Sequence, residues 1–118
     1  MFELMVEDTF SAAHQLKGYK GRCENLHGHT FKVQIFIEGE KLKPEGYLID
    51  FQDLKAALKK VLDELDHSYL NDLPYFKELN PTAESLAKLI YEKMRPLVSD
   101  LKKVTVWESA SASASYRP

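Results

Sequence analysis

Apolar and polar residues alternate at the start of the chain, and the same alternation returns more strongly between Thr30 and Glu38. The apolar members of the two runs are Phe2, Leu4, Val6 and Phe10, and then Phe31, Val33, Ile35 and Ile37. A period of two indicates a strand with one buried face. A third alternating run, from Lys103 to Ser109, predicts another long strand near the end of the chain.

Two stretches in the middle of the chain repeat their apolar residues at helical spacing. The first follows Asp50, a good helix N-cap, and its apolar stripe runs from Phe51 to Leu65. At the start of the second, either Asn80 caps with Pro81 in the first helical position, or Thr82 caps. The order strand, strand, helix, helix, strand predicts an α+β domain, in which two helices cover one face of an antiparallel sheet.

Composition narrows the class of protein. The chain has 118 residues, the size of one ordinary domain. Sixteen Lys and Arg against eighteen Asp and Glu give a net charge of −2, so a nucleic-acid partner is not expected. No membrane segment or signal peptide is evident, and a single cysteine excludes an internal disulfide, so we expect a cytoplasmic protein. The Ser/Ala-rich tail at residues 111–115 is either a strand or a flexible end.

Histidines carry the strongest chemical signal. His27 and His29 are two residues apart, and on a strand they point to the same side, where both can bind one ion. If the first two strands pair as antiparallel neighbours, His14 meets them at one end of the sheet, on its apolar face. Three imidazoles leave the fourth position of a tetrahedral zinc ion open, as in catalytic sites. The alternative is coincidence, because a His-x-His pair in a strand is often no metal site.

Cys23 lies four residues before His27 and has three interpretations. It could be a fourth ligand that closes the metal site. It could be a reactive thiolate, whose pKa is lowered by the nearby Lys17, Lys20 and Arg22. It could also be an inert buried thiol, which is the usual fate of a free cysteine.

Three further ionisable residues are candidates for function. Asp66 and His67 are either a surface pair at a helix end or a dyad in which the carboxylate orients the imidazole for proton transfer. Glu108 shares the parity of Val104 and Val106, which directs it toward the apolar side, where a carboxylate needs a partner. A heterocycle with an N–H beside an exocyclic amine would offer it two parallel donors. Alternatively, the strand ends before Glu108 and the carboxylate is solvated.

The order of several short motifs is more specific than any of them alone. They are Phe10-Ser11-Ala12-Ala13-His14, Cys23-x-x-x-His27-Gly28-His29, Asp50-Phe51, Leu65-Asp66-His67, Pro81-Thr82-Ala83-Glu84 and Trp107-Glu108. Together they resemble the 6-pyruvoyl-tetrahydropterin synthase family, which includes 6-carboxytetrahydropterin synthase of the queuosine pathway. The resemblance implies that residues 1–118 form one tunnelling-fold domain, which assembles into a β-barrel trimer and, by stacking two trimers, into a homohexamer.

The resemblance also implies a reaction and a set of site residues. It assigns His14, His27 and His29 as ligands of Zn²⁺, Cys23, Asp66 and His67 as the catalytic set, and Glu108 as the anchor of the pterin. The implied enzyme is a zinc-dependent lyase that converts 7,8-dihydroneopterin triphosphate to 6-carboxy-5,6,7,8-tetrahydropterin with loss of triphosphate and acetaldehyde.

Three alternatives to this reaction stay open. The first is 6-pyruvoyl-tetrahydropterin synthase activity on the same substrate. The second arises because some family members have glutamate in place of the cysteine and cleave the side chain differently, and here Glu24 lies next to Cys23. The third belongs to another class, a non-catalytic oligomeric protein with a closed Cys-His₃ structural zinc site.

Overall fold

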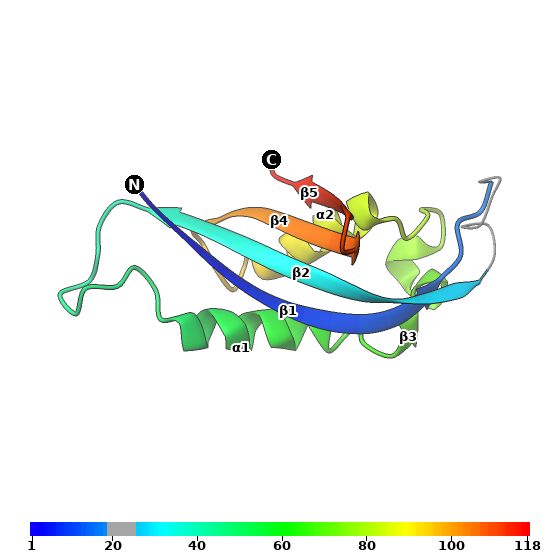
Figure 1. The fold of residues 1–118 in the computed structure, drawn as a ribbon, viewed down its shortest axis with the longest axis horizontal. Helices are drawn as coiled ribbons and strands as arrows, with labels where there is room; N and C mark the ends of the chain where they lie inside the picture. Colours follow the sequence, from blue (N-terminus) through cyan, green and yellow to red (C-terminus); the bar gives the residue numbers. More distant parts are fainter. Residues whose placement is uncertain (19–25) are drawn as a thin grey trace.

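The computed structural model describes residues 1–18 and 26–118. The two longest strands form an antiparallel pair that runs along the length of the protein (Figure 1). Its elements are β1 (Phe2–His14), β2 (His27–Gly39), α1 (Phe51–Leu62), β3 (Ser68–Tyr69), η2 (Leu70–Asp72), η3 (Pro74–Phe76), α2 (Ala83–Met94), β4 (Leu101–Ser109) and β5 (Ala112–Tyr116). The predicted α+β class is confirmed.

The sheet has five strands in the order β3-β1-β2-β4-β5 and is mixed. The expectation of a purely antiparallel sheet is wrong at one edge, where β3 pairs with β1 in parallel and Ser68 lies opposite Ala12. A strand of two residues is too short to show a period, so the sequence gives no sign of it. The Ser/Ala-rich tail forms β5, antiparallel to β4, which decides between the two alternatives for that segment.

The hairpin keeps its register over its full length. The β1–β2 pairing runs without interruption from Phe2 opposite Gly39 to His14 opposite His27. A bulge near Gly28 would have moved the histidines to different faces, and none is present in this pairing. The register shifts lie instead in the pairings of β4, between Phe36 and Ile37 and between Trp107 and Ser109.

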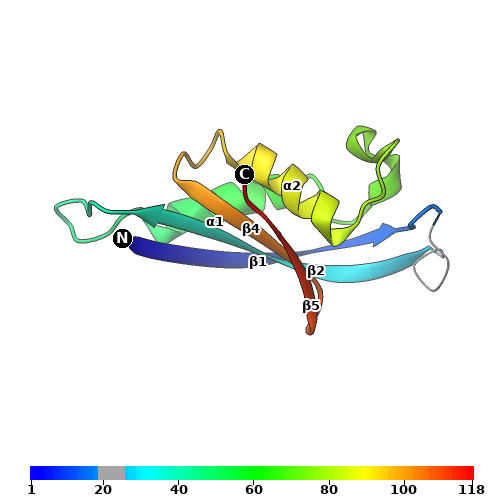
Figure 2. The same cartoon turned by 90° about the horizontal axis from the view of Figure 1, so that it is seen from above.

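Both helices lie on the same side of the sheet (Figure 2). Asp50 caps α1, as predicted, by accepting a 2.8 Å hydrogen bond from the backbone N–H of Gln52. Thr82 caps α2, since its hydroxyl accepts from the backbone N–H of Ser85 at 3.1 Å. Helix α1 ends at Leu62, earlier than its apolar stripe suggests, and Leu65 is buried in the turns that follow. In the part of the chain that the structure describes, no helix is long and apolar enough to cross a membrane.

The helices cover the face of the sheet that is formed by the apolar residues of the strands. Phe31, Val33, Ile35 and Ile37 of β2 are fully buried against them. The opposite face carries polar contacts, such as the 2.9 Å hydrogen bond from the Trp107 indole N–H to the Gln34 side chain. The radius of gyration is 15.2 Å, against about 13 Å for a typical domain of this length. The chain is therefore elongated, with one sheet face covered by helices and one left uncovered.

Candidate metal centre

Three histidines gather where β1 ends and β2 begins. His14 is the last residue of β1 and lies directly opposite His27, while His29 follows on the same face of β2. Their ring centroids are 4.5 Å apart for His14–His27 and His27–His29, and 5.1 Å apart for His14–His29. Together with Glu108 they offer four ligand atoms that all lie within 4.8 Å of one another. Strand parity thus places the three imidazoles as the sequence predicts.

The orientation of His14 is set by a backbone carbonyl. His14 is fully buried, and its Nδ1 lies 2.8 Å from the carbonyl oxygen of Pro81. Because a carbonyl can only accept, Nδ1 carries the proton, and Nε2 of the neutral ring holds its lone pair. That Nε2 faces the cluster, 2.9 Å from Nε2 of His27. Pro81 directly precedes the N-cap of α2, so the start of this helix positions the first strand's histidine.

The surroundings of His29, like the orientation of His14, indicate that the cluster can bind a metal cation. Its Nε2 is buried and makes no hydrogen bond with the described residues, although Oε1 of Glu108 lies 3.2 Å away. Burial lowers the pKa of His29, an effect that Glu108 opposes and that His14 and His27 reinforce. A lowered pKa keeps the imidazole neutral, which is the form that binds metal ions.

Glu108 completes the cluster from β4. Strand β4 continues to Ser109, so the alternative in which Glu108 lies beyond the strand is wrong. Its carboxylate faces His29 on the apolar side and is 28% exposed. Imidazole nitrogens and a carboxylate oxygen form a donor set that zinc accepts readily. The residues present therefore fit a zinc ion, and the Pro81 carbonyl orients His14 so that its Nε2 faces the cluster.

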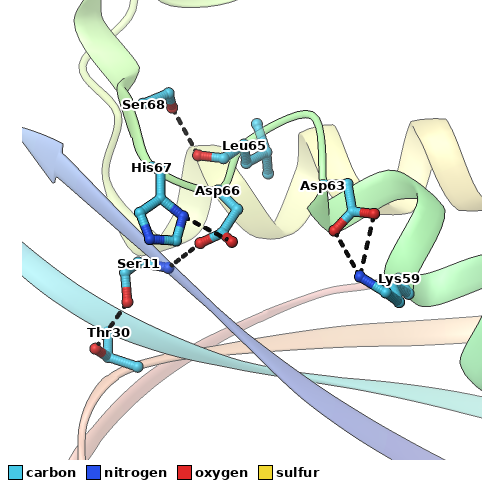
Figure 3. Close-up of polar contacts among 8 residues, drawn as sticks. All are labelled: Ser11, Thr30, Lys59, Asp63, Leu65, Asp66, His67 and Ser68. Carbon is cyan, nitrogen blue, oxygen red and sulfur yellow. Dashed lines mark hydrogen bonds and ion pairs between the residues drawn. The ribbon is translucent and has the colours of Figure 1, made fainter.

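Asp66 and His67 form a second polar group at the outer edge of β1 (Figure 3). The two oxygens of Asp66 divide their contacts: Oδ1 accepts from the backbone N–H of Ser11 at 2.8 Å, and Oδ2 lies 2.9 Å from Nδ1 of His67. The hydrogen bond from Ser11 lowers the pKa of Asp66, with a further contribution from His67. The carboxylate thus stays ionised and holds the imidazole, as the dyad interpretation requires.

His67 has an unusual backbone conformation. Its φ of 57° lies in the left-handed region, which costs a side-chain-bearing residue energy. Its imidazole is 84% exposed and lines a hollow of about 520 Å³ whose other walls include Ser11 and Thr30, which have the opposite parity to the histidine ligands, and also His29 itself. Within one chain, His67 therefore lies beside the outer edge of β1, on the side of β1 away from β2 and β4.

Cys23, Glu24 and the basic residues Lys20 and Arg22 lie outside the described residues. The chain that leads to them is held by two asparagine side chains, which the sequence analysis did not assign to the site. Asn71 bonds both backbone groups of Gln15, and Asn80 bonds both backbone groups of Lys17, each at 2.8 Å. Asn80 thus braces this segment and does not cap the helix.

Comparisons with known proteins place the chain among proteins of one family. Residues 3–118 match the family model described as 6-pyruvoyl tetrahydropterin synthase. A 6-carboxy-5,6,7,8-tetrahydropterin synthase of Haemophilus influenzae is 31% identical, covering 99% of each chain. A dihydroneopterin monophosphate aldolase of Pyrococcus furiosus is 41% identical over 85% of this chain and 83% of the relative. The solved 6-pyruvoyl tetrahydropterin synthase of Caenorhabditis elegans superposes with a TM-score of 0.90 at 31% identity, over 99% of this chain and 95% of the other.

Proposed function

The chain belongs to the 6-pyruvoyl tetrahydropterin synthase family, and we propose that it is a zinc-dependent lyase that forms 6-carboxy-5,6,7,8-tetrahydropterin from 7,8-dihydroneopterin triphosphate. Water is consumed, and triphosphate and acetaldehyde are released. The observation that carries this proposal is the cluster of His14, His27 and His29, in which the hydrogen bond to the Pro81 carbonyl puts the proton of His14 on Nδ1 and leaves the lone pair of Nε2 facing the cluster. The name of the Haemophilus influenzae relative supports the choice of product.

The three histidines would hold the metal ion. Zinc bound there supplies Lewis-acid catalysis, polarising oxygen atoms of the substrate side chain and acidifying the protons next to them. The chain's own part is orientation, because the strand pairing and the Pro81 carbonyl fix the imidazoles in place before substrate arrives.

Proton transfer is assigned to Cys23, Asp66 and His67. In this proposal the Cys23 thiolate takes a proton from the substrate side chain, and His67 carries protons to and from it. Asp66 acts as a positioning residue, since its carboxylate holds Nδ1 of His67 and leaves Nε2 for the substrate. The left-handed backbone at His67 supports this role, because strain of this kind is usually kept where the side chain is needed.

Glu108 would recognise the heterocycle. A pterin offers a ring N–H beside an exocyclic amine, and a carboxylate accepts both hydrogen bonds at once. Its partial exposure of 28% leaves the Glu108 carboxylate accessible to an incoming ligand.

Assembly of several copies is part of the proposal, with a homohexamer of two stacked trimers as the expected form. Among the described residues β1 has a strand partner on its outer edge only at Ala12 and Ala13, so the edge before them can accept another strand. The elongated shape and the uncovered sheet face also favour association. His67 of one copy would then complete the metal centre of another.

A second candidate function is aldol cleavage of the pterin side chain. The relative that favours it is the Pyrococcus furiosus protein, named dihydroneopterin monophosphate aldolase and 41% identical to this chain. Cleavage between the first two side-chain carbons would leave a 6-hydroxymethyl pterin and a phosphorylated two-carbon aldehyde. Cys23 favours the synthase reaction, while the adjacent Glu24 offers a carboxylate for the aldolase.

Product analysis separates these reactions. We expect the zinc-loaded protein to convert 7,8-dihydroneopterin triphosphate to a 6-carboxy pterin by mass spectrometry, with acetaldehyde formed in equal amount. A 6-pyruvoyl product without acetaldehyde would select the first alternative. A 6-hydroxymethyl product, from the triphosphate or from the monophosphate offered in parallel, would select the aldolase.

The Cys23→Ala variant distinguishes the proposed synthase from the non-catalytic alternative. A catalytic thiolate predicts a variant that keeps its zinc and loses turnover by about 10²-fold or more. A closed Cys-His₃ site predicts the reverse pattern, with zinc lost from the variant and no turnover in the wild type.

A further inference from the structure

The position of Glu108 requires an explanation beyond recognition of the substrate. Its Oε1 lies 3.2 Å from Nε2 of His29, an imidazole nitrogen that has no hydrogen bond with any described residue. The carboxylate is also one of the four groups whose ligand atoms lie within 4.8 Å of one another. An anchor for a heterocycle could be placed anywhere along the pocket wall, but this carboxylate is inside the metal-binding cluster.

We propose that Glu108 is the fourth ligand of the metal ion while the site is free of substrate, and that binding of the heterocycle removes it. The inference rests on the proposed function, in which the same carboxylate receives the pterin. Three neutral imidazoles and one carboxylate satisfy a four-coordinate zinc ion and halve its charge, which stabilises a partly buried cation.

The two roles of Glu108 exclude each other. Paired recognition of a ring N–H and an amine uses both carboxylate oxygens. A carboxylate that has turned toward the heterocycle therefore cannot also ligate the ion. The fourth coordination position opens only when a pterin is in place, so other small ligands meet a closed centre. Because binding energies are reciprocal, a pterin that takes Glu108 without replacing it must also weaken zinc binding.

The first test measures zinc affinity in three proteins by competition with a chromogenic chelator. We expect Glu108→Gln to raise the zinc dissociation constant by about 10-fold or more, the range found when partners of a metal ligand set are removed. Glu3→Gln, which removes the same charge at the far end of the sheet, should leave the constant at its wild-type value. Equal affinities for wild type and Glu108→Gln would overturn the proposal.

The second test measures exchangeable water on the metal, first in the wild type and then in the Glu108→Gln variant. In the cobalt-loaded wild type we expect little enhancement of the relaxation of water protons, because Glu108 fills the open position. Addition of unsubstituted pterin, which has no hydroxylated side chain to replace the carboxylate, should raise this relaxation and weaken metal binding. The Glu108→Gln protein should show the high relaxation from the start.

The outcomes distinguish this inference from the function on which it rests. A wild type that already shows full water relaxation, or a pterin that binds by fluorescence titration without changing it, would refute ligand exchange and leave the synthase proposal intact. Failure of the wild type to bind zinc would contradict both.

Discussion

At the scale of single residues, the proposed chemistry depends on which nitrogen of His14 and of His67 is held by a neighbouring oxygen. His14 donates from Nδ1 to a carbonyl, so Nε2 faces the cluster. His67 contacts Asp66 through the same atom, Nδ1, so its Nε2 is directed elsewhere. Strand parity was enough to predict that His14, His27 and His29 meet. The contact of His14 with the Pro81 carbonyl could not be predicted in the same way, because every residue has a backbone carbonyl and the sequence does not indicate which one will face the imidazole.

Two variants of His67 test the energetic cost of its left-handed backbone and the role of its imidazole in catalysis. Both His67→Ala and His67→Gly remove the imidazole, and each should lower turnover by about 10²-fold or more. Only glycine adopts the observed φ of 57° without cost, so His67→Gly should be more stable than His67→Ala by about 1 kcal/mol. Urea unfolding of the two variants gives this difference. Equal stability would mean that the left-handed conformation costs nothing, and full turnover in both would remove His67 from the mechanism.

At the scale of elements, alternation along the chain predicted the three long strands, left β5 undecided and gave no sign of β3. Strands β1 and β2 bury one parity, and β4 does so except at Thr105, which makes the pattern of all three strands detectable. Strand β3 has only two residues, and β5 alternates mainly alanine with serine, which is a weak contrast although Ala114 and Tyr116 pack against the core. The apolar stripe of α1 continues to Leu65 because that residue joins the core from a turn.

Removing one backbone N–H donor from the outer edge of β1 tests whether this edge pairs with a second copy of the chain. The backbone N–H and carbonyl of Ser11 both point away from β2, toward Asp66 and His67. Because these directions alternate along a strand, Glu7 presents its N–H to the same edge. Glu7→Pro should therefore block pairing with a second copy and leave the hairpin intact. Sedimentation should show a smaller species for Glu7→Pro and an unchanged one for Glu7→Ala. An identical assembly for both would exclude pairing through this part of β1.

At the scale of the whole molecule, the family was predictable because its motifs are spread over nearly the full chain. The reaction is harder to predict from the sequence than the family, because similar proteins are named as a carboxy-forming synthase, a pyruvoyl-forming synthase and an aldolase. The fold is common to all of these functions. Cys23 and Glu24, the two residues that the proposal uses to choose between synthase and aldolase, lie in the segment that the structure does not describe.

The separation of His67, beside the outer edge of β1, from Glu108, on β4, has a consequence for mixtures of inactive variants. If each catalytic centre takes Glu108 from one copy and His67 from another, two inactive proteins can rescue each other. A mixture of His67→Gly and Glu108→Gln subunits, dissociated and reassembled at equal amounts, should regain activity at about a quarter of its centres, because random pairing unites the two intact residues that often. Turnover measured before and after mixing decides the matter: a mixture as inactive as its parents would mean that each subunit works alone.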